Sequence, residues 1–228
     1  MNIRNPSQSL IDSFGIQILC LKRCILSTIY CAVVALVPMV ATSSEVDERA
    51  LYDLAPENSS FVRLINLTES PQRIRLDKVT LSVPSYCSAS GYKPINAGKY
   101  PLQLGKNELM TSMHSNLAYS LVVDKSGVTL VADTMVKSPR KSLVSVYNFT
   151  SVSDLFVKTA DGKHSVFSSL ASGDRASREI NPVKVNFAVF SEAEKLSDVD
   201  ATIFERGVVS TLLLCGDKDS MQAQWVRQ

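Results

Sequence analysis

Two histidines are the first side chains to consider for chemistry. An acyl-transfer site of the Ser-His-Asp kind needs an imidazole base beside a serine, with a carboxylate to orient the ring. His114 lies in the polar stretch Met113-His114-Ser115-Asn116, and His164 directly follows the turn residues Asp161-Gly162-Lys163. Both patterns are typical of exposed loops. The sequence also has no Gly-x-Ser-x-Gly motif. We therefore predict no catalytic residues and a protein that is not an enzyme.

Metal and cofactor chemistry are not indicated either. Structural zinc sites place Cys and His ligands at short, fixed spacings such as Cys-x-x-Cys, and no such spacing occurs. Asp217 and Asp219 have two of the spacings of a calcium-binding loop. The segment lacks the glycine and the final glutamate of that loop, so calcium binding is not favoured. We predict no metal site and no cofactor.

Three arginines are the candidate binding residues. Arg73 and Arg75 alternate with Ile74 and Leu76, so a strand here would project both guanidinium groups from one face. Together with Arg63 they are predicted to meet carboxylates, either of a polyuronate or of an acidic protein partner. The alternative, that these arginines only solvate the outer face of a sheet, stays open at this point.

The remaining reactive side chains are cysteines. Three of the five lie within the first 31 residues, which leaves Cys87 and Cys215. An exported chain meets an oxidising compartment, where two thiols can form one bridge. The two positions are not equivalent in the two halves of the chain. The sequence therefore leaves open both a disulfide between the halves and two separate thiols.

The N-terminus has the pattern of an export signal. Lys22 and Arg23 precede the charge-free apolar run from Cys24 to Ala41, which ends at a polar, acidic stretch. Residues 1–41 are predicted to be a signal peptide. The alternative is an uncleaved anchor of about 18 residues, which is at the lower limit for crossing a bilayer.

Charge argues against nucleic acid as a partner. The whole chain has 24 basic and 22 acidic residues. Removing residues 1–41 takes away three basic residues and one acidic residue, which leaves 21 of each. Binding to phosphates needs a basic excess or a strong basic patch. The mature chain is formally neutral, so we exclude nucleic-acid binding.

A repeat defines the elements that must position these side chains. Ser60-Phe61-Val62-Arg63-Leu64-Ile65-Asn66-Leu67-Thr68 returns 82 residues later as Ser142-Leu143-Val144-Ser145-Val146-Tyr147-Asn148-Phe149-Thr150. Both copies are apolar and β-branched runs that end in a turn-forming Asn-x-Thr. We predict an all-β chain of two tandem small antiparallel β-sandwich domains, Ig-like or jelly-roll-like. Their predicted limits are residues 42–136 and 137–228, with Met135–Ser142 as the linker.

Alternating and apolar patterns predict the other strands. In the first half these are residues 73–76, 79–83, 100–104, 118–123 and 128–131. In the second half they are 154–158, 165–168, 208–215 and a buried strand over 183–190. Helical periodicity is weak throughout. Only Ser191–Leu196 has a pattern that allows a turn or two of helix.

Two stretches carry a resemblance to a known family. Leu51-Tyr52-Asp53-Leu54-Ala55-Pro56 has the form Leu-Tyr-x-x-Ala-Pro, and Ser59–Asn66 has the form Ser-x-Phe-Val-Arg-x-x-Asn. With an exported leader and two β-rich halves, the sequence resembles the AlgF family of periplasmic accessory proteins in bacterial alginate O-acetylation. The resemblance covers essentially the whole mature chain.

The resemblance implies a function. It implies a non-catalytic periplasmic adaptor that acts with a membrane-bound O-acyltransferase and a periplasmic acetyltransferase on the hydroxyls of mannuronate residues. An independent extracytoplasmic carbohydrate-binding or adhesive module is the alternative, and an acetyl carrier or transferase is a third, weaker one. Carbohydrate-binding modules usually present aromatic platforms, whereas aromatic residues make up only 7% of this chain. This composition favours the adaptor.

Overall fold

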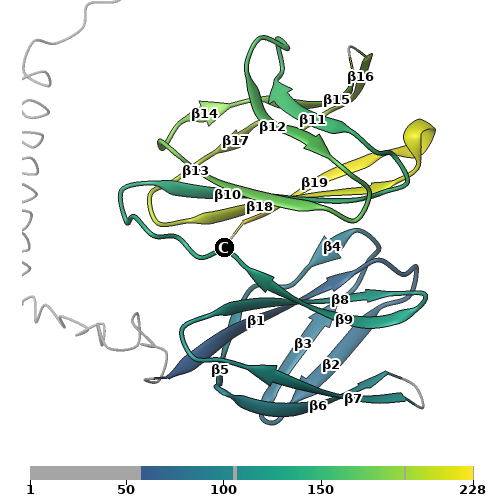
Figure 1. The fold of residues 1–228 in the computed structure, drawn as a ribbon, viewed down its shortest axis with the longest axis vertical. Coiled ribbons are helices and arrows are strands. Elements are labelled where there is room, and N and C mark those ends of the chain that lie inside the picture. Colours follow the sequence, from purple (N-terminus) through teal and green to yellow (C-terminus); the bar gives the residue numbers. More distant parts are fainter. Residues whose placement is uncertain (1–57, 105–106, 193, 228) are drawn as a thin grey trace, which may run out of the picture. The chain divides into compact units, whose positions relative to one another are not determined.

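The structure, a computed structural model, describes residues 58–104, 107–192 and 194–227. The predicted signal peptide or anchor and the Leu51–Pro56 stretch lie outside the described residues. From residue 58 onwards the chain belongs to one compact unit. In the described residues the regular elements are β-strands and one short 3₁₀-helix, so the all-β prediction is confirmed (Figure 1). No helix in the described ranges has the length and apolarity needed to cross a bilayer.

The N-terminal half is built around one mixed sheet. Its central strand β1 pairs in parallel with β8, and β8 continues antiparallel to β9. The other edge of β1 pairs with β5 at its start and with β4 at its end. The bounds are β1 Ser59–Asn66, β4 Ser88–Ala89, β5 Lys93–Asn96, β8 Ala118–Asp124 and β9 Gly127–Asp133.

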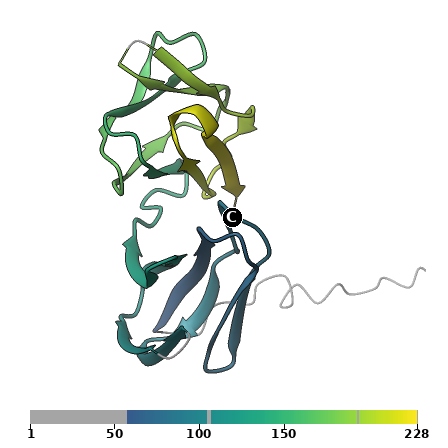
Figure 2. The same ribbon diagram turned by 90° about the vertical axis from the view of Figure 1, so that its right-hand side faces the viewer.

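Two hairpins cover one face of this sheet. They are β2 Gln72–Leu76 with β3 Val79–Val83, and β6 Gly98–Leu104 with β7 Asn107–Met113. Figure 2 shows the strands of this half, in blue to teal, in two layers. Val62 and Leu64 of β1 pack between the layers with apolar residues of both hairpins, such as Leu81 and Leu102. The hydrophobic core of this half therefore lies on one face of β1.

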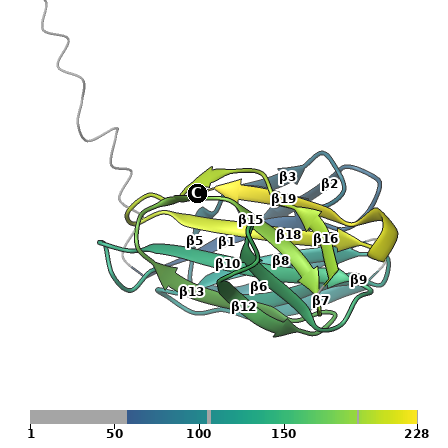
Figure 3. The ribbon, with the colours of Figure 1, turned by 90° about the horizontal axis from the view of Figure 1, so that it is seen from above.

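The C-terminal half repeats the arrangement. β10 Ser142–Thr150 pairs in parallel with β18 Val209–Gly216, and β13 Arg175–Ile180 and β19 Gln222–Arg227 complete the sheet on either side. A second sheet contains β12 Ser165–Leu170, β11 Leu155–Thr159, β15 Phe187–Ser191 and β16 Glu194–Asp198. In the view from above, β15 and β16 cross the direction of β18 and β19 (Figure 3). A second core, which includes Val146 and Leu212, lies between these sheets.

The predicted strand repeat is present as a repeated pair of strands. Arg63 in β1 lies opposite Ser120 in β8, and the equivalent Ser145 in β10 lies opposite Thr211 in β18. The strand patterns did not reveal that these two central pairs are parallel, because parallel and antiparallel partners share the same side-chain alternation. The predicted boundary between residues 136 and 137 stays a prediction.

Two local predictions in the second half were wrong. Residues 183–190 do not form one buried strand, because the chain breaks at Asn186 between β14 Lys184–Val185 and β15. β14 instead pairs with β17 Thr202–Ile203, and Val183 is 47% exposed. The expected helical turns over Ser191–Leu196 are replaced by the β15–β16 hairpin. There the apolar side of the second sheet determines the conformation rather than local helix propensity.

Candidate functional site

The candidate site lies where the faces of β1 and β10 that point away from their cores meet. Val62 and Leu64 enter the N-terminal core, so Arg63 between them points to the opposite face of the sheet. Val146 likewise enters the C-terminal core, while Tyr147 points away from it. Side chains from these two faces are hydrogen-bonded to one another, as described below.

The Arg63 guanidinium group is buried among partners from both halves. Its side chain is 1% exposed. Nε donates to Ser120 Oγ at 2.7 Å and Nη1 donates to Thr211 Oγ1 at 2.8 Å. Nη2 donates to Tyr147 Oη at 3.5 Å, and the guanidinium carbon lies 4.6 Å from the ring centroid of Tyr92. One cation therefore joins β1 and β8 to β10 and β18.

Asp133, at the end of β9, supplies the opposite charge. Its Oδ2 accepts hydrogen bonds from Tyr92 Oη and Ser120 Oγ, each at 2.6 Å, and lies 3.7 Å from Nε of Arg63. Its Oδ1 accepts a hydrogen bond from the Tyr147 hydroxyl. Both charged groups are therefore buried with hydrogen-bond partners, as buried charges require. We call Arg63, Tyr92, Ser120, Asp133, Tyr147 and Thr211 the junction cluster.

The two tyrosines of the junction cluster are held in the neutral state. Burial raises the pKa of Tyr147 to about 12; the negative charge of Asp133 adds to this effect, and the positive charge of Arg63 opposes it. Burial also raises the pKa of Tyr92 well above its ordinary value, again against the effect of Arg63. Both phenols therefore act as fixed hydrogen-bond donors to Asp133 at neutral pH.

A disulfide joins the halves beside this cluster. Cys87, which precedes β4, is bonded to Cys215 of β18, so the structure decides between the two possibilities that the sequence left open. Both cysteines are fully buried. They belong to a third apolar cluster that contains Ile65 and Val122 from the first half and Leu213 from the second. A covalent bond, apolar packing and the hydrogen bonds of the junction cluster therefore all connect the two halves.

The linker between the halves is fastened to the second one. Glu179 of β13 accepts hydrogen bonds from the backbone amides of Lys137, at 2.7 Å, and Ser138, at 3.0 Å. These two bonds hold the pKa of the Glu179 carboxyl below its usual range. The carbonyl of Lys141 accepts a third bond, from the amide of Gly207 at 2.8 Å. Basic residues at 137, 140 and 141 remain on the surface of this segment.

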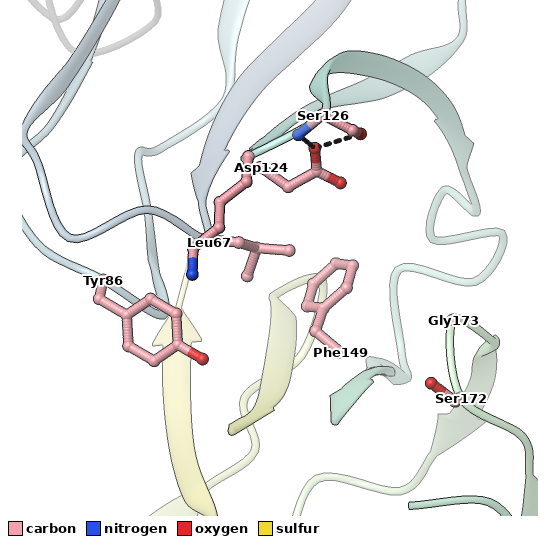
Figure 4. A pocket seen from close by; sticks show the side chains of 8 residues that line it. Leu67, Tyr86, Asp124, Ser126, Phe149, Ser172 and Gly173 are labelled. Atoms are coloured by element: carbon pink, nitrogen blue, oxygen red, sulfur yellow. Dashed lines mark hydrogen bonds between the residues drawn. The ribbon is translucent and has the colours of Figure 1, made fainter. Parts of the chain in front are cut away.

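Two hollows lie at the ends of the central strands. The first, of about 450 Å³, is lined by residues at the ends of β1, β8 and β10 and by the turn between β12 and β13 (Figure 4). Leu67, Tyr86 and Phe149 give it apolar walls. The Asp124 carboxylate accepts hydrogen bonds from the amide and hydroxyl groups of Ser126, which fixes the neighbouring turn. We call it the turn hollow.

The second hollow has a volume of about 500 Å³ and lies near the starts of β1, β8 and β18. Its lining comes from β1, β8, β18, the linker and the loops that precede β5 and β18, and includes Phe61, Tyr92, Met135, Val136 and Gly207. Most of these groups are apolar. Tyr92 belongs both to this hollow and to the junction cluster. We call it the linker groove.

The structure separates the three arginines that the sequence grouped. Arg73 and Arg75 are exposed on the outer face of β2, while Ile74 and Leu76 are buried, as the alternation predicted. Arg63 is not part of that exposed face, because it points away from the core that lies between β1 and β2. It does meet a carboxylate, but that carboxylate is Asp133 of the same chain. Binding of a partner or polymer by these arginines stays a prediction.

The positions of the two histidines agree with the loops expected from the sequence. His114 and His164 are both exposed, in loops that follow β7 and precede β12. Among the described residues, neither imidazole ring forms a hydrogen bond with a serine or a carboxylate. Within the same ranges no three His, Cys, Asp or Glu side chains gather as a metal site would require.

Of the junction cluster, the sequence indicated only Arg63 as a site residue; it did not indicate Tyr92, Ser120, Asp133, Tyr147 or Thr211. One signal was present. Arg63 interrupts a nearly continuous apolar run, and strands of that type are buried on both faces. An arginine there needs a buried partner, although nothing in the pattern indicates that Asp133 is that partner.

Comparisons with known proteins place the chain in a family. The family described as "Alginate O-acetyl transferase AlgF" matches residues 32–211. The alginate biosynthesis protein AlgF of Pseudomonas aeruginosa is 34% identical over 192 residues, which are 83% of this chain and 88% of the relative. AlgF of Azotobacter vinelandii is 34% identical over 182 residues, or 79% and 83% of the two chains.

A solved domain structure is among those similar to this chain. The C-terminal domain of AlgF from P. aeruginosa is 39% identical, covers 39% of this chain and 99% of that domain, and superposes with a TM-score of 0.36. The family match extends over well more than half of the chain, and the curated relatives are matched along most of their length. The chain therefore belongs to the AlgF family of alginate biosynthesis proteins.

Proposed function

We propose that this protein is a non-catalytic periplasmic adaptor of alginate O-acetylation, which acts with a membrane-bound O-acyltransferase and a periplasmic acetyltransferase. The observation that carries the proposal is family membership over residues 32–211. The family description names an O-acetyl transferase, and its members are named for alginate biosynthesis. The proposal assigns this chain to the acetylation step without assigning the chemistry to it.

The contacts of the polar side chains support the adaptor role. Arg63 and Asp133 direct their hydrogen bonds to other residues of the same chain, which is typical of a structural cluster. The raised pKa of Tyr147 makes its phenol a poor nucleophile and a poor base at neutral pH. His114 and His164 are exposed on loops.

The disulfide supports the proposed location. Bonded cysteines persist in oxidising compartments, such as the bacterial periplasm, and are rare in the cytosol. Cys87 and Cys215 form such a bond across the chain. An export signal in residues 1–41 would deliver the chain to that compartment.

Deletion and complementation in the host test the proposal. Deletion is expected to lower the acetyl content of the exported polymer without stopping polymer synthesis. Wild-type protein and the double variant His114→Ala/His164→Ala are both expected to restore acetylation, since neither imidazole is assigned a chemical role. If the double variant accumulated at the wild-type level, kept its fold and failed to restore acetyl groups, the protein would have to be treated as an enzyme.

A further inference from the structure

The linker groove has the form of a preformed docking site. Phe61 and Tyr92 come from the first half, Met135 and Val136 from the linker, and Gly207 from the second half. Met135 is 36% exposed although its side chain is large and apolar. A hollow of about 500 Å³ with this lining is large enough to take bulky apolar side chains.

Contacts with neighbouring residues fix the positions of Tyr92 and of the linker, which both line the groove. The Tyr92 hydroxyl is bonded to Asp133, and its ring packs against the Arg63 guanidinium group. Glu179 holds the linker through the amides of Lys137 and Ser138. A ligand entering here does not have to order the linker first, and such preorganisation lowers the cost of binding.

The rim of the groove is basic. Lys137 and Arg206 directly adjoin the lining residues Val136 and Gly207 in the chain, and both are exposed. Lys93, which follows the lining residue Tyr92, donates instead to the carbonyl of Thr80 in β3. The acidic residue that adjoins the lining is Asp133, whose side chain is 4% exposed within the junction cluster. Glu205, one residue further along, is paired with Arg227. The exposed charges next to the lining are therefore positive.

We propose that the linker groove docks an acidic segment of a protein partner, with a large apolar side chain of that segment inserted between Tyr92 and Met135. An apolar centre inside a charged rim is the usual anatomy of a protein interface, and complementary charge on the partner steers association. This inference rests on the proposed adaptor function and names its contact surface. It does not use Arg73 or Arg75, which lie on the outer face of β2.

Two variants test the groove by different means. Lys137→Glu/Arg206→Glu reverses the rim charge. Gly91→Trp fills the groove, because a Cβ at Gly91, a lining residue, meets nothing within 4 Å. The matched control Lys78→Glu/Lys163→Glu makes the same charge change in two exposed turns away from the groove. Circular dichroism and thermal melting establish that each variant folds, and either folded variant is sufficient for the test.

The assay is titration of the full chain against the purified periplasmic acetyltransferase and, separately, the detergent-solubilised membrane-bound O-acyltransferase. The wild-type protein and the control variant are expected to bind one of these two proteins, and to bind it with the same affinity. Each groove variant is expected to bind about tenfold more weakly or worse, because central contacts carry most interface energy. If the wild-type protein binds neither partner, the proposed adaptor function is wrong.

The docking inference is wrong if the wild-type protein binds a partner and both groove variants bind it equally well. It is also wrong if the groove variants lose only the binding of added polyuronate. In both cases the adaptor function would remain, with a different contact surface.

Discussion

Asn66 and Asn148, which lie 82 positions apart, make the same side-chain contacts at the ends of β1 and β10. Each Oδ1 accepts hydrogen bonds from the amide and the hydroxyl of the threonine two residues later. Each Nδ2 donates at 2.9 Å to the carbonyl four residues later, at Ser70 or Val152. Both asparagines are fully buried. The repeated Asn-x-Thr therefore builds one turn twice.

The two turns are predicted to differ in their contribution to stability. Asn148 Nδ2 also reaches the carbonyls of Leu170 and Ala171, at 3.1 and 3.0 Å. Replacing Asn148 with Ala removes these two further hydrogen bonds, and a hydrogen bond typically contributes about 0.5 to 1.5 kcal/mol to stability. Urea unfolding should show a larger loss of unfolding free energy for Asn148→Ala. Equal losses would mean that these two extra contacts add nothing.

This turn and the neighbouring strands could be predicted from the sequence, because they depend on local patterns. Apolar alternation in Arg73–Leu76 and Val79–Val83 is enough to predict a strand and its buried side. The junction cluster was not accessible in this way. Asp133 is 70 residues from Arg63, and their meeting depends on the strand order β1-β8-β9 within one sheet, which is not encoded in a short pattern.

The failures in the second half have the same physical origin. Residues 183–190 are almost continuously apolar, which is typical of a buried strand. The chain nevertheless divides at Asn186 so that β14 pairs with β17 and β15 pairs with β11 and β16. The strand β19 was also missed, because its core contacts come mainly from Ala223 and Trp225, at alternate positions in a polar segment. Tertiary pairing overrides the local signal at these places.

Removing the carboxylate of the junction cluster should destabilise the fold strongly. Asp133→Asn leaves the buried Arg63 cation without its counter-charge, which typically costs about 3 to 5 kcal/mol. Adding Arg63→Met to this variant should recover part of the loss, because the unpaired charge is then removed as well. A double-mutant cycle from denaturant unfolding measures this coupling. Asp219→Asn, at an exposed position, is the control. If the losses of unfolding free energy from Asp133→Asn and Arg63→Met simply added in the double variant, the pairing of the two residues would be contradicted.

Loss of the disulfide should also lower stability. The bond joins residues 128 positions apart, and closing so long a loop restricts the unfolded chain. Cys87→Ala/Cys215→Ala is expected to lose about 2 to 5 kcal/mol of unfolding free energy. Thermal melting with and without reductant checks this result. Wild-type protein should melt lower in reductant while the double variant does not respond; a wild-type protein that ignores reductant would contradict the bond.

High pH should weaken the junction through Tyr147. Its pKa is raised from 10.0 to about 12, so the folded state keeps the proton where the unfolded state has released it. The stabilisation is complete below pH 10 and is lost as pH rises toward 12, by on the order of 3 kcal/mol. Unfolding free energies over this range should fall more steeply for wild type than for Tyr147→Phe. If the unfolding free energy fell equally steeply with pH in both proteins, the Tyr147 hydroxyl would not be responsible for the loss of stability.

The central claim is that this protein acts by contact with the acetylation proteins. It is tested most directly by one binding experiment with the wild-type full chain, in which retention of the purified periplasmic acetyltransferase or membrane-bound O-acyltransferase is compared with titration by purified polyuronate. The adaptor account predicts that a protein partner is retained at concentrations where polyuronate binds weakly. Tight polyuronate binding with neither protein retained would contradict the account and would favour an independent carbohydrate-binding module.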